Sequence, residues 1–315
     1  MHPSPRARRV RLSRLAAVAV LLALVATACS GSDAAEEGGF PQQSFGDLPA
    51  EIDYVAMGDS YSAGPLVTTV RSDPSGCVRS TDNYPAFLAG WLDVETYTDV
   101  TCSAADTGDF TRRQQMVDGK RVAPQLDAVS TDTDLVTLGI GGNDFGIFSS
   151  LVGCAEGCSP KQQKRLLRDA ARVEARVRKV VEAITDRAPE AEVFVIGYPQ
   201  VLPEDESCGA VPLTPAQLDA AAEIAGRLNG SLAAGAEGAS ASYVDVSDAS
   251  EGHDVCAGKA AWINGPEMLP GIAAPFHPVL DGMRGVAAEV FSEITGDEAP
   301  QAERAAPPRD AVVRN

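Results

Sequence analysis

The chain has 315 residues, a formal net charge of −18, and 22% charged residues. This length can bury a sizeable core in one large domain or two smaller ones, and the charged fraction is ordinary for a folded protein. The strong negative charge argues against nucleic acid as a partner, because an acidic surface repels phosphates.

The N-terminus has the pattern of an export signal. Five arginines precede an apolar run over 15–26, which is too short to span a bilayer but typical of a signal peptide. We therefore expect residues 1–28 to be removed. Their removal takes away five positive charges and no acids, so the formal net charge changes from −18 to −23.

The seven cysteines indicate an oxidising compartment. Cys29 ends the segment Val25-Ala26-Thr27-Ala28-Cys29, which resembles a bacterial lipobox, although Ala26 stands where leucine is usual. We expect a lipidated Cys29 that attaches an exported cell-surface lipoprotein to the membrane. The alternative is ordinary cleavage after Ala28, which would leave Cys29 as a free thiol on a released extracellular protein. Either way, six cysteines remain and suit three disulfides.

Strands and helices alternate along the rest of the chain, which predicts one α/β domain with a parallel sheet. Apolar runs predict the strands, and helical spacing of apolar residues predicts the helices. The expected strands are 52–57, 94–100, 134–140, 191–198 and 243–246. The expected helices are 84–91, 161–187, 215–234 and 279–294.

The flanking segments have a different composition from this domain. Residues 29–50 are small, acidic and poor in aromatics, as a flexible linker would be. Residues 297–315 are rich in proline, alanine and charge, and we expect a disordered tail there. The folded domain is therefore predicted to span 51–296.

Ser60 is the candidate nucleophile. It lies directly after the first expected strand, in Gly58-Asp59-Ser60, at the sheet edge where open α/β folds place their chemistry. A serine here can also be a simple helix N-cap, so the pattern alone leaves both interpretations open.

A serine nucleophile requires a base, and histidine is the side chain suited to that task near neutral pH. Besides His2 in the signal peptide, the chain contains His253 and His277. His277 directly precedes the last expected helix, whereas His253 lies in a polar loop, so we favour His277. Two distant histidines and six cysteines that we expect to be oxidised predict no metal site.

Ester cleavage also requires donors for the developing oxyanion. Asn143 follows the third expected strand in Gly141-Gly142-Asn143-Asp144 and can donate through its side-chain amide; it can also be an ordinary turn residue. The backbone N–H of Ala104 follows the second expected strand, at the equivalent sheet edge. A third donor is the backbone N–H of Ser60.

These segments in this order resemble the SGNH hydrolase (GDSL lipase/esterase) family. Gly58-Asp59-Ser60-Tyr61-Ser62 resembles its nucleophile block, Gly141-Gly142-Asn143-Asp144 its asparagine block and Phe276-His277-Pro278 its histidine block. The resemblance is greatest to secreted actinobacterial lipases with three disulfides. It implies a flavodoxin-like three-layer α/β/α sandwich around a five-stranded parallel sheet, with no metal and no cofactor. By the same likeness we pair Cys77 with Cys102, Cys154 with Cys158 and Cys208 with Cys256.

Two positions depart from the family pattern. Ala104 stands where glycine is usual, and Ala274 stands where an acid often precedes the histidine. With no local acid, we expect the carbonyl of Ala274 or Pro275 to orient His277.

The resemblance implies a monomeric serine esterase or lipase that hydrolyses carboxylic, fatty acyl esters through an acyl-enzyme. One alternative is an O-deacetylase that acts on cell-wall glycans with the same site. The other is a surface lipoprotein that has kept the fold as a non-catalytic binding module.

Overall fold

The computed structural model describes residues 48–154, 157–204, 206–306 and 312–314. The predicted signal peptide, Cys29 and all but the last three residues of the predicted linker lie outside the described residues. Within the described ranges, no helix is both long enough and apolar enough to span a membrane.

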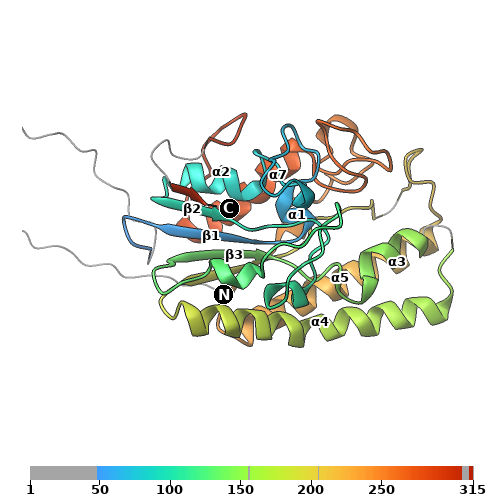
Figure 1. The fold of residues 1–315 in the computed structure, drawn as a ribbon. Helices are drawn as coiled ribbons and strands as arrows, with labels where there is room; N and C mark the ends of the chain where they lie inside the picture. Colours follow the sequence, from blue (N-terminus) through green and yellow to red (C-terminus); the bar gives the residue numbers. More distant parts are fainter. Residues whose placement is uncertain (1–47, 155–156, 205, 307–311, 315) are drawn as a thin grey trace, which may run out of the picture. The chain divides into compact units, whose positions relative to one another are not determined.

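A parallel sheet lies at the centre of the fold (Figure 1). The strand order is β5-β4-β3-β1-β2-β6, so the first strand is central. The five predicted strands are all present, each within two residues of its predicted bounds, and a sixth was not predicted. The strands are β1 (Asp53–Gly58), β2 (Thr96–Asp99), β3 (Leu135–Gly139), β4 (Glu192–Ile196), β5 (Ser242–Val244) and β6 (Val312–Arg314).

Strand β1 shows why the sheet is buried on both faces. Val55 and Met57 contribute to one hydrophobic cluster, while Tyr54 and Ala56 contribute to the other. Alternate side chains of a strand point to opposite faces. An almost continuous apolar run therefore requires a helical layer on each side of the sheet.

Helices provide those two layers (Figure 1). α2 (Tyr84–Trp91) and α7 (Leu280–Thr295) cover one face, and α4 (Pro160–Arg187) and α5 (Pro215–Glu237) cover the other. The predicted three-layer α/β/α sandwich is confirmed. Three short helices were not predicted: α1 (Ser60–Ala63), α3 (Ile147–Cys154) and α6 (Val246–Ala249).

The described parts of the predicted tail, 297–306 and 312–314, contact the domain. Val312–Arg314 forms β6, which pairs with the edge of β2 that would otherwise be open. Before it, the Arg304 guanidinium lies 3.3 Å from a carboxylate oxygen of Asp82, and the Ala305 backbone N–H donates to the other oxygen at 3.0 Å. This tail segment is therefore attached to the domain by hydrogen bonds.

Two of the expected disulfides are present, Cys77–Cys102 and Cys208–Cys256. Cys158 is also disulfide-bonded. The side chain of its predicted partner, Cys154, lies outside the described part of the chain, so that pairing stays a prediction.

Candidate active site

Ser60 lies at the carboxyl end of the central strand β1, as the first residue of α1. Gly58 adopts a φ of +145° in the turn that connects them, and a Cβ there would lie 2.4 Å from Ser62 Oγ and 2.5 Å from the Gly139 carbonyl oxygen. Only glycine fits this turn without displacing its neighbours. The Ser60 side chain is thereby presented at the sheet edge, with 7% of the residue exposed.

The structure brings Ser60 and His277 together across 217 residues of sequence. The His277 Nε2 atom lies 2.8 Å from Ser60 Oγ, and its Nδ1 atom lies 2.7 Å from the Pro275 carbonyl oxygen. A carbonyl oxygen can only accept, so Nδ1 carries the hydrogen and Nε2 of the neutral ring can accept the Ser60 proton. Of the two carbonyls considered from the sequence, that of Pro275 orients the ring.

The environment of His277 favours the neutral imidazole. Burial disfavours the charged ring and lowers the pKa of His277 below 6.5, while the hydrogen bond to the Pro275 carbonyl opposes this shift. A neutral ring near pH 7 is the form that can act as a base.

The loop that carries His277 is held by Asn264, a buried residue that was not singled out from the sequence. The Asn264 side-chain amide donates to the carbonyls of Ala273 and Ala274, each at 3.0 Å. Its backbone N–H donates to the His277 carbonyl at 2.9 Å. One residue thus fixes both sides of the histidine loop.

Through Tyr198, Asp59 links the turn before Ser60 to the turn that carries Asn143. The Tyr198 hydroxyl donates to an Asp59 carboxylate oxygen at 2.6 Å and accepts from the Gly142 backbone N–H at 2.8 Å. The Tyr61 backbone N–H donates to the other Asp59 oxygen at 2.9 Å. Asp59 is completely buried, and this burial raises its pKa to about 7, although both hydrogen bonds oppose the shift.

Asn143 and Ala104 lie on the loops that follow β3 and β2, the two neighbours of β1. The Asn143 side-chain amide donates one hydrogen to the Ala105 carbonyl at 3.0 Å, which leaves its second hydrogen available. Among the hydrogen bonds of the described residues, neither the Ser60 nor the Ala104 backbone N–H has a protein acceptor. These are three donors that a substrate oxygen could use.

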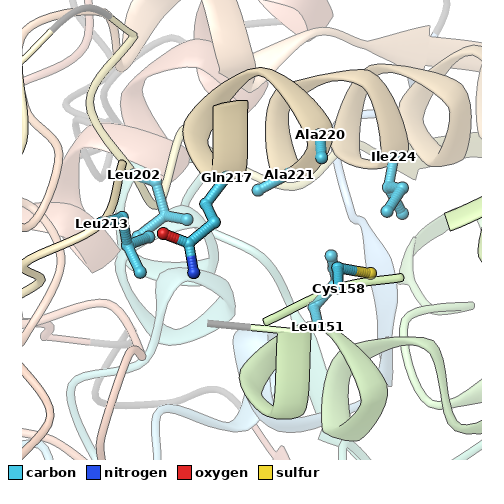
Figure 2. A pocket seen from close by; sticks show the side chains of 8 residues that line it. All are labelled: Leu151, Cys158, Leu202, Leu213, Gln217, Ala220, Ala221 and Ile224. Atoms are coloured by element: carbon cyan, nitrogen blue, oxygen red, sulfur yellow. The ribbon is translucent and has the colours of Figure 1, made fainter. Parts of the chain in front are cut away.

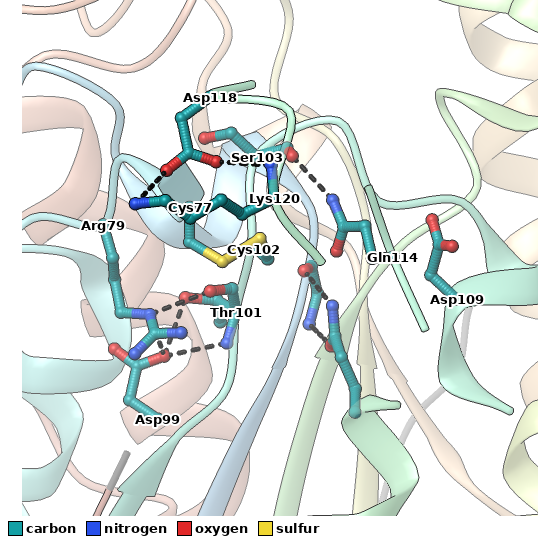
Figure 3. Close-up of a disulfide and its surroundings, with 12 residues drawn as sticks. Cys77, Arg79, Asp99, Thr101, Cys102, Ser103, Asp109, Gln114, Asp118 and Lys120 are labelled. Carbon is teal, nitrogen blue, oxygen red and sulfur yellow. Dashed lines mark hydrogen bonds and ion pairs between the residues drawn. A yellow bond between two sulfur atoms is a disulfide. The ribbon is translucent and has the colours of Figure 1, made fainter. Parts of the chain in front are cut away.

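Ala104 adopts a left-handed conformation with a φ of +67°. This conformation explains why glycine is usual at the position, since glycine adopts it with the least strain. The preceding disulfide holds the segment in place (Figure 3). The Ser103 backbone N–H donates to the Cys77 carbonyl at 3.0 Å, and the Gln114 side chain donates to the Ser103 carbonyl at 2.8 Å.

The comparisons with known proteins decide the family. A model of the GDSL-like Lipase/Acylhydrolase family matches residues 56–284, which include all three sequence blocks. The chain belongs to this family. It is therefore a carboxylic ester hydrolase of the GDSL type.

Proteins similar to this GDSL hydrolase include lipases from Streptomyces. The chain is similar to Lipase 2 of Streptomyces coelicolor, with 38% identity over 90% of this chain and 96% of that protein. Among solved structures, it is similar to an extracellular lipase from Streptomyces rimosus, with 30% identity and a TM-score of 0.66 over 78% of this chain and 100% of that one. It is also similar to phospholipase A1 from Streptomyces albidoflavus, with 29% identity and a TM-score of 0.65 over 76% of this chain and 98% of that one.

The alternative base, His253, has other partners in the GDSL hydrolase. Its Nδ1 atom lies 2.6 Å from the Ala260 carbonyl oxygen, and its ring stacks on Trp262. No group of three or more His, Cys, Asp or Glu side chains within the described ranges is placed to hold a metal ion.

A small apolar cavity lies between α3 and α5, lined by Leu151, Cys158 and Ile224 among others (Figure 2). Its volume is about 30 Å³. Ser60, Asn143 and His277 are not among the residues that line it.

Sequence reasoning missed the side chains that connect the blocks, namely Tyr198, Asn264 and Tyr61, whose hydroxyl donates to the Phe276 carbonyl. Each connects segments that are distant in sequence, so no local pattern identifies them. The available signals were positional: Tyr61 is adjacent to Ser60, and Tyr198 ends an expected strand.

Proposed function

We propose that this GDSL hydrolase cleaves fatty acyl esters through an acyl-enzyme on Ser60, with His277 as the base. The observation that carries the proposal is the 2.8 Å separation of His277 Nε2 and Ser60 Oγ, together with an Nδ1 that is committed to the Pro275 carbonyl. A nucleophile and base within hydrogen-bond reach, with the base oriented by a third group, is the arrangement expected for covalent catalysis.

In the first half-reaction, the Ser60 proton moves to His277 Nε2 as Ser60 Oγ attacks the ester carbonyl carbon. The tetrahedral intermediate then collapses, the bond to the leaving oxygen breaks, and His277 returns the proton to the leaving alcohol. In the second half-reaction, His277 takes a proton from water, which attacks the acyl-enzyme. Release of the carboxylic acid returns the proton to Ser60.

The oxyanion of each tetrahedral intermediate needs donors that are already in place. In this proposal, the backbone N–H groups of Ser60 and Ala104 and the side-chain amide of Asn143 donate to it. The Tyr198 hydroxyl supports this arrangement, because it connects Asp59 to Gly142, the residues that immediately precede Ser60 and Asn143.

We further propose that the enzyme is exported as a monomer and attached to the cell surface through lipidated Cys29. The disulfides support export, because such bonds persist in oxidising compartments. Metabolic labelling with a clickable fatty acid tests attachment. A labelled wild type and an unlabelled Cys29→Ser variant are expected, and an unlabelled wild type would favour release.

Hydrolysis of p-nitrophenyl esters from acetyl to palmitoyl by the purified mature chain tests the activity. We expect turnover of medium and long chains and a loss of about 10⁴-fold or more in Ser60→Ala. Ser62→Ala is the matched control, since it removes a neighbouring buried hydroxyl that does not contact His277.

The deacetylase alternative has its own outcome in this assay. Turnover confined to acetyl esters would favour the deacetylase. Full turnover in Ser60→Ala would remove the proposed mechanism.

A further inference from the structure

Tyr61 contacts the histidine loop in two ways. Its ring lies against the His277 imidazole, with centroids 5.0 Å apart and planes inclined by 33°. Its hydroxyl donates to the Phe276 carbonyl at 2.7 Å. Because Tyr61 directly follows Ser60 on α1, it connects the nucleophile segment to the base segment.

The histidine loop needs such support because of its backbone. Phe276 adopts a left-handed φ of +57°, which is unfavourable for a bulky residue. The Phe276 backbone N–H donates to the Gly265 carbonyl at 3.1 Å, and the Phe276 carbonyl accepts from Tyr61. Hydrogen bonds on both sides of Phe276 thus hold the conformation that precedes His277.

Among the described residues, the hydrogen-bond partners of the imidazole are the Pro275 carbonyl and Ser60, and neither is a carboxylate. The orienting carbonyl belongs to Pro275, within the same loop, so any movement of the loop moves both the ring and its partner. The Tyr61 ring is itself held in place, since the rings of Tyr198 and Phe148 lie 5.1 and 5.3 Å from it. Tyr61 is therefore a rigid contact to the loop from the nucleophile side.

We propose that Tyr61 is a positioning residue for the base. Its hydroxyl fixes the Phe276 peptide and its ring fixes the imidazole plane, so that Nε2 stays directed at Ser60 Oγ. The inference rests on the proposed function of Ser60 and His277.

Tyr61→Phe tests the proposal, because it keeps the ring contacts and removes only the hydroxyl. We expect kcat to fall about 10- to 100-fold, as for a small misplacement of a reacting group, with KM within about twofold of the wild type. Tyr54→Phe is the matched control: it removes another buried phenol hydroxyl, which contacts Thr137 in β3 and no residue of the site. We expect Tyr54→Phe to retain the wild-type kcat.

Two further measurements separate positioning from a general loss of structure. A looser loop admits water to the imidazole, so the pKa of His277 rises back toward its ordinary value and the acidic limb of kcat/KM moves to higher pH. NMR spectra of ¹⁵N-histidine-labelled protein, assigned with His253→Gln, should show the same change in the His277 ring without relying on activity.

The possible failures can be told apart. If the wild type is active and Tyr61→Phe shows the same kcat, the same acidic limb and the same His277 signals, the positioning role alone is overturned. A lower kcat with an unchanged pH limb and unchanged His277 signals would also overturn it. A wild type with no more ester turnover than Ser60→Ala would instead refute the proposed function.

Discussion

Asp59→Asn should make the protein more stable at alkaline pH. The folded-state pKa of Asp59 is about 7, compared with the ordinary 3.8, and burial is the main cause. Between these two values the folded chain keeps a proton that the unfolded chain releases, so the unfolding free energy falls as pH rises. Stability from this group is fully present below pH 3.8 and is lost as pH passes through 7.

The difference between the folded and the ordinary pKa of Asp59 sets the size of this loss. It corresponds to roughly 4 kcal/mol of unfolding free energy at pH 8. Asparagine carries no charge and can still accept from the Tyr61 backbone N–H, so the variant lacks this loss. Urea unfolding from pH 4 to pH 8 measures how the unfolding free energy of each protein depends on pH. Asp219→Asn, on the exposed face of α5, is the control for the loss of one acid. The unfolding free energy of Asp59→Asn should increase relative to that of the wild type as pH rises. A difference between the two proteins that stays constant with pH would refute the assigned role of burial.

Three other changes test separate parts of the site. Asn143→Ala should lower kcat by about 10²- to 10³-fold with little change in KM, because the lost donor acts on the oxyanion; steady-state kinetics measures this, and an equal rise in KM with kcat intact would contradict it. The acidic limb of kcat/KM for the wild type should have its midpoint below pH 6.5, since burial lowers the pKa of His277; a midpoint above that value would contradict the assigned environment. Replacing both Cys77 and Cys102 by serine should lower the unfolding free energy by about 3 to 4 kcal/mol in urea unfolding, as expected for a loop of 25 residues. It should also lower kcat, because the disulfide holds the segment that carries Ala104. An unchanged kcat would show that the disulfide does not hold this segment.

Local signals predict five of the six strands and place Ser60, Asn143 and His277 at the ends of elements. The strands are near-continuous apolar runs, and each candidate follows a strand or precedes a helix, so burial and element order place them in the fold. Ser60 and Asn143 lie at one edge of the parallel sheet, because the carboxyl ends of β1 and β3 lie side by side.

The residues that connect these segments could not be predicted in this way. Tyr198 contacts Asp59 across 139 residues, and Asn264 acts on backbone carbonyls, which any sequence provides. Strand β6 spans only three residues, too few to show an alternating pattern, and it forms because β2 presents an open edge. Such features depend on tertiary contacts rather than on local sequence.

The central claim is that Ser60 is a nucleophile activated by His277, and covalent labelling tests it most directly. A fluorophosphonate probe, followed by peptide mass spectrometry, identifies the reacting side chain in the wild type and in His277→Gln. We expect a single phosphonyl adduct on the peptide that contains Ser60, with labelling slowed by orders of magnitude in His277→Gln. An adduct on another residue, or equal labelling rates in the two proteins, would contradict the claim.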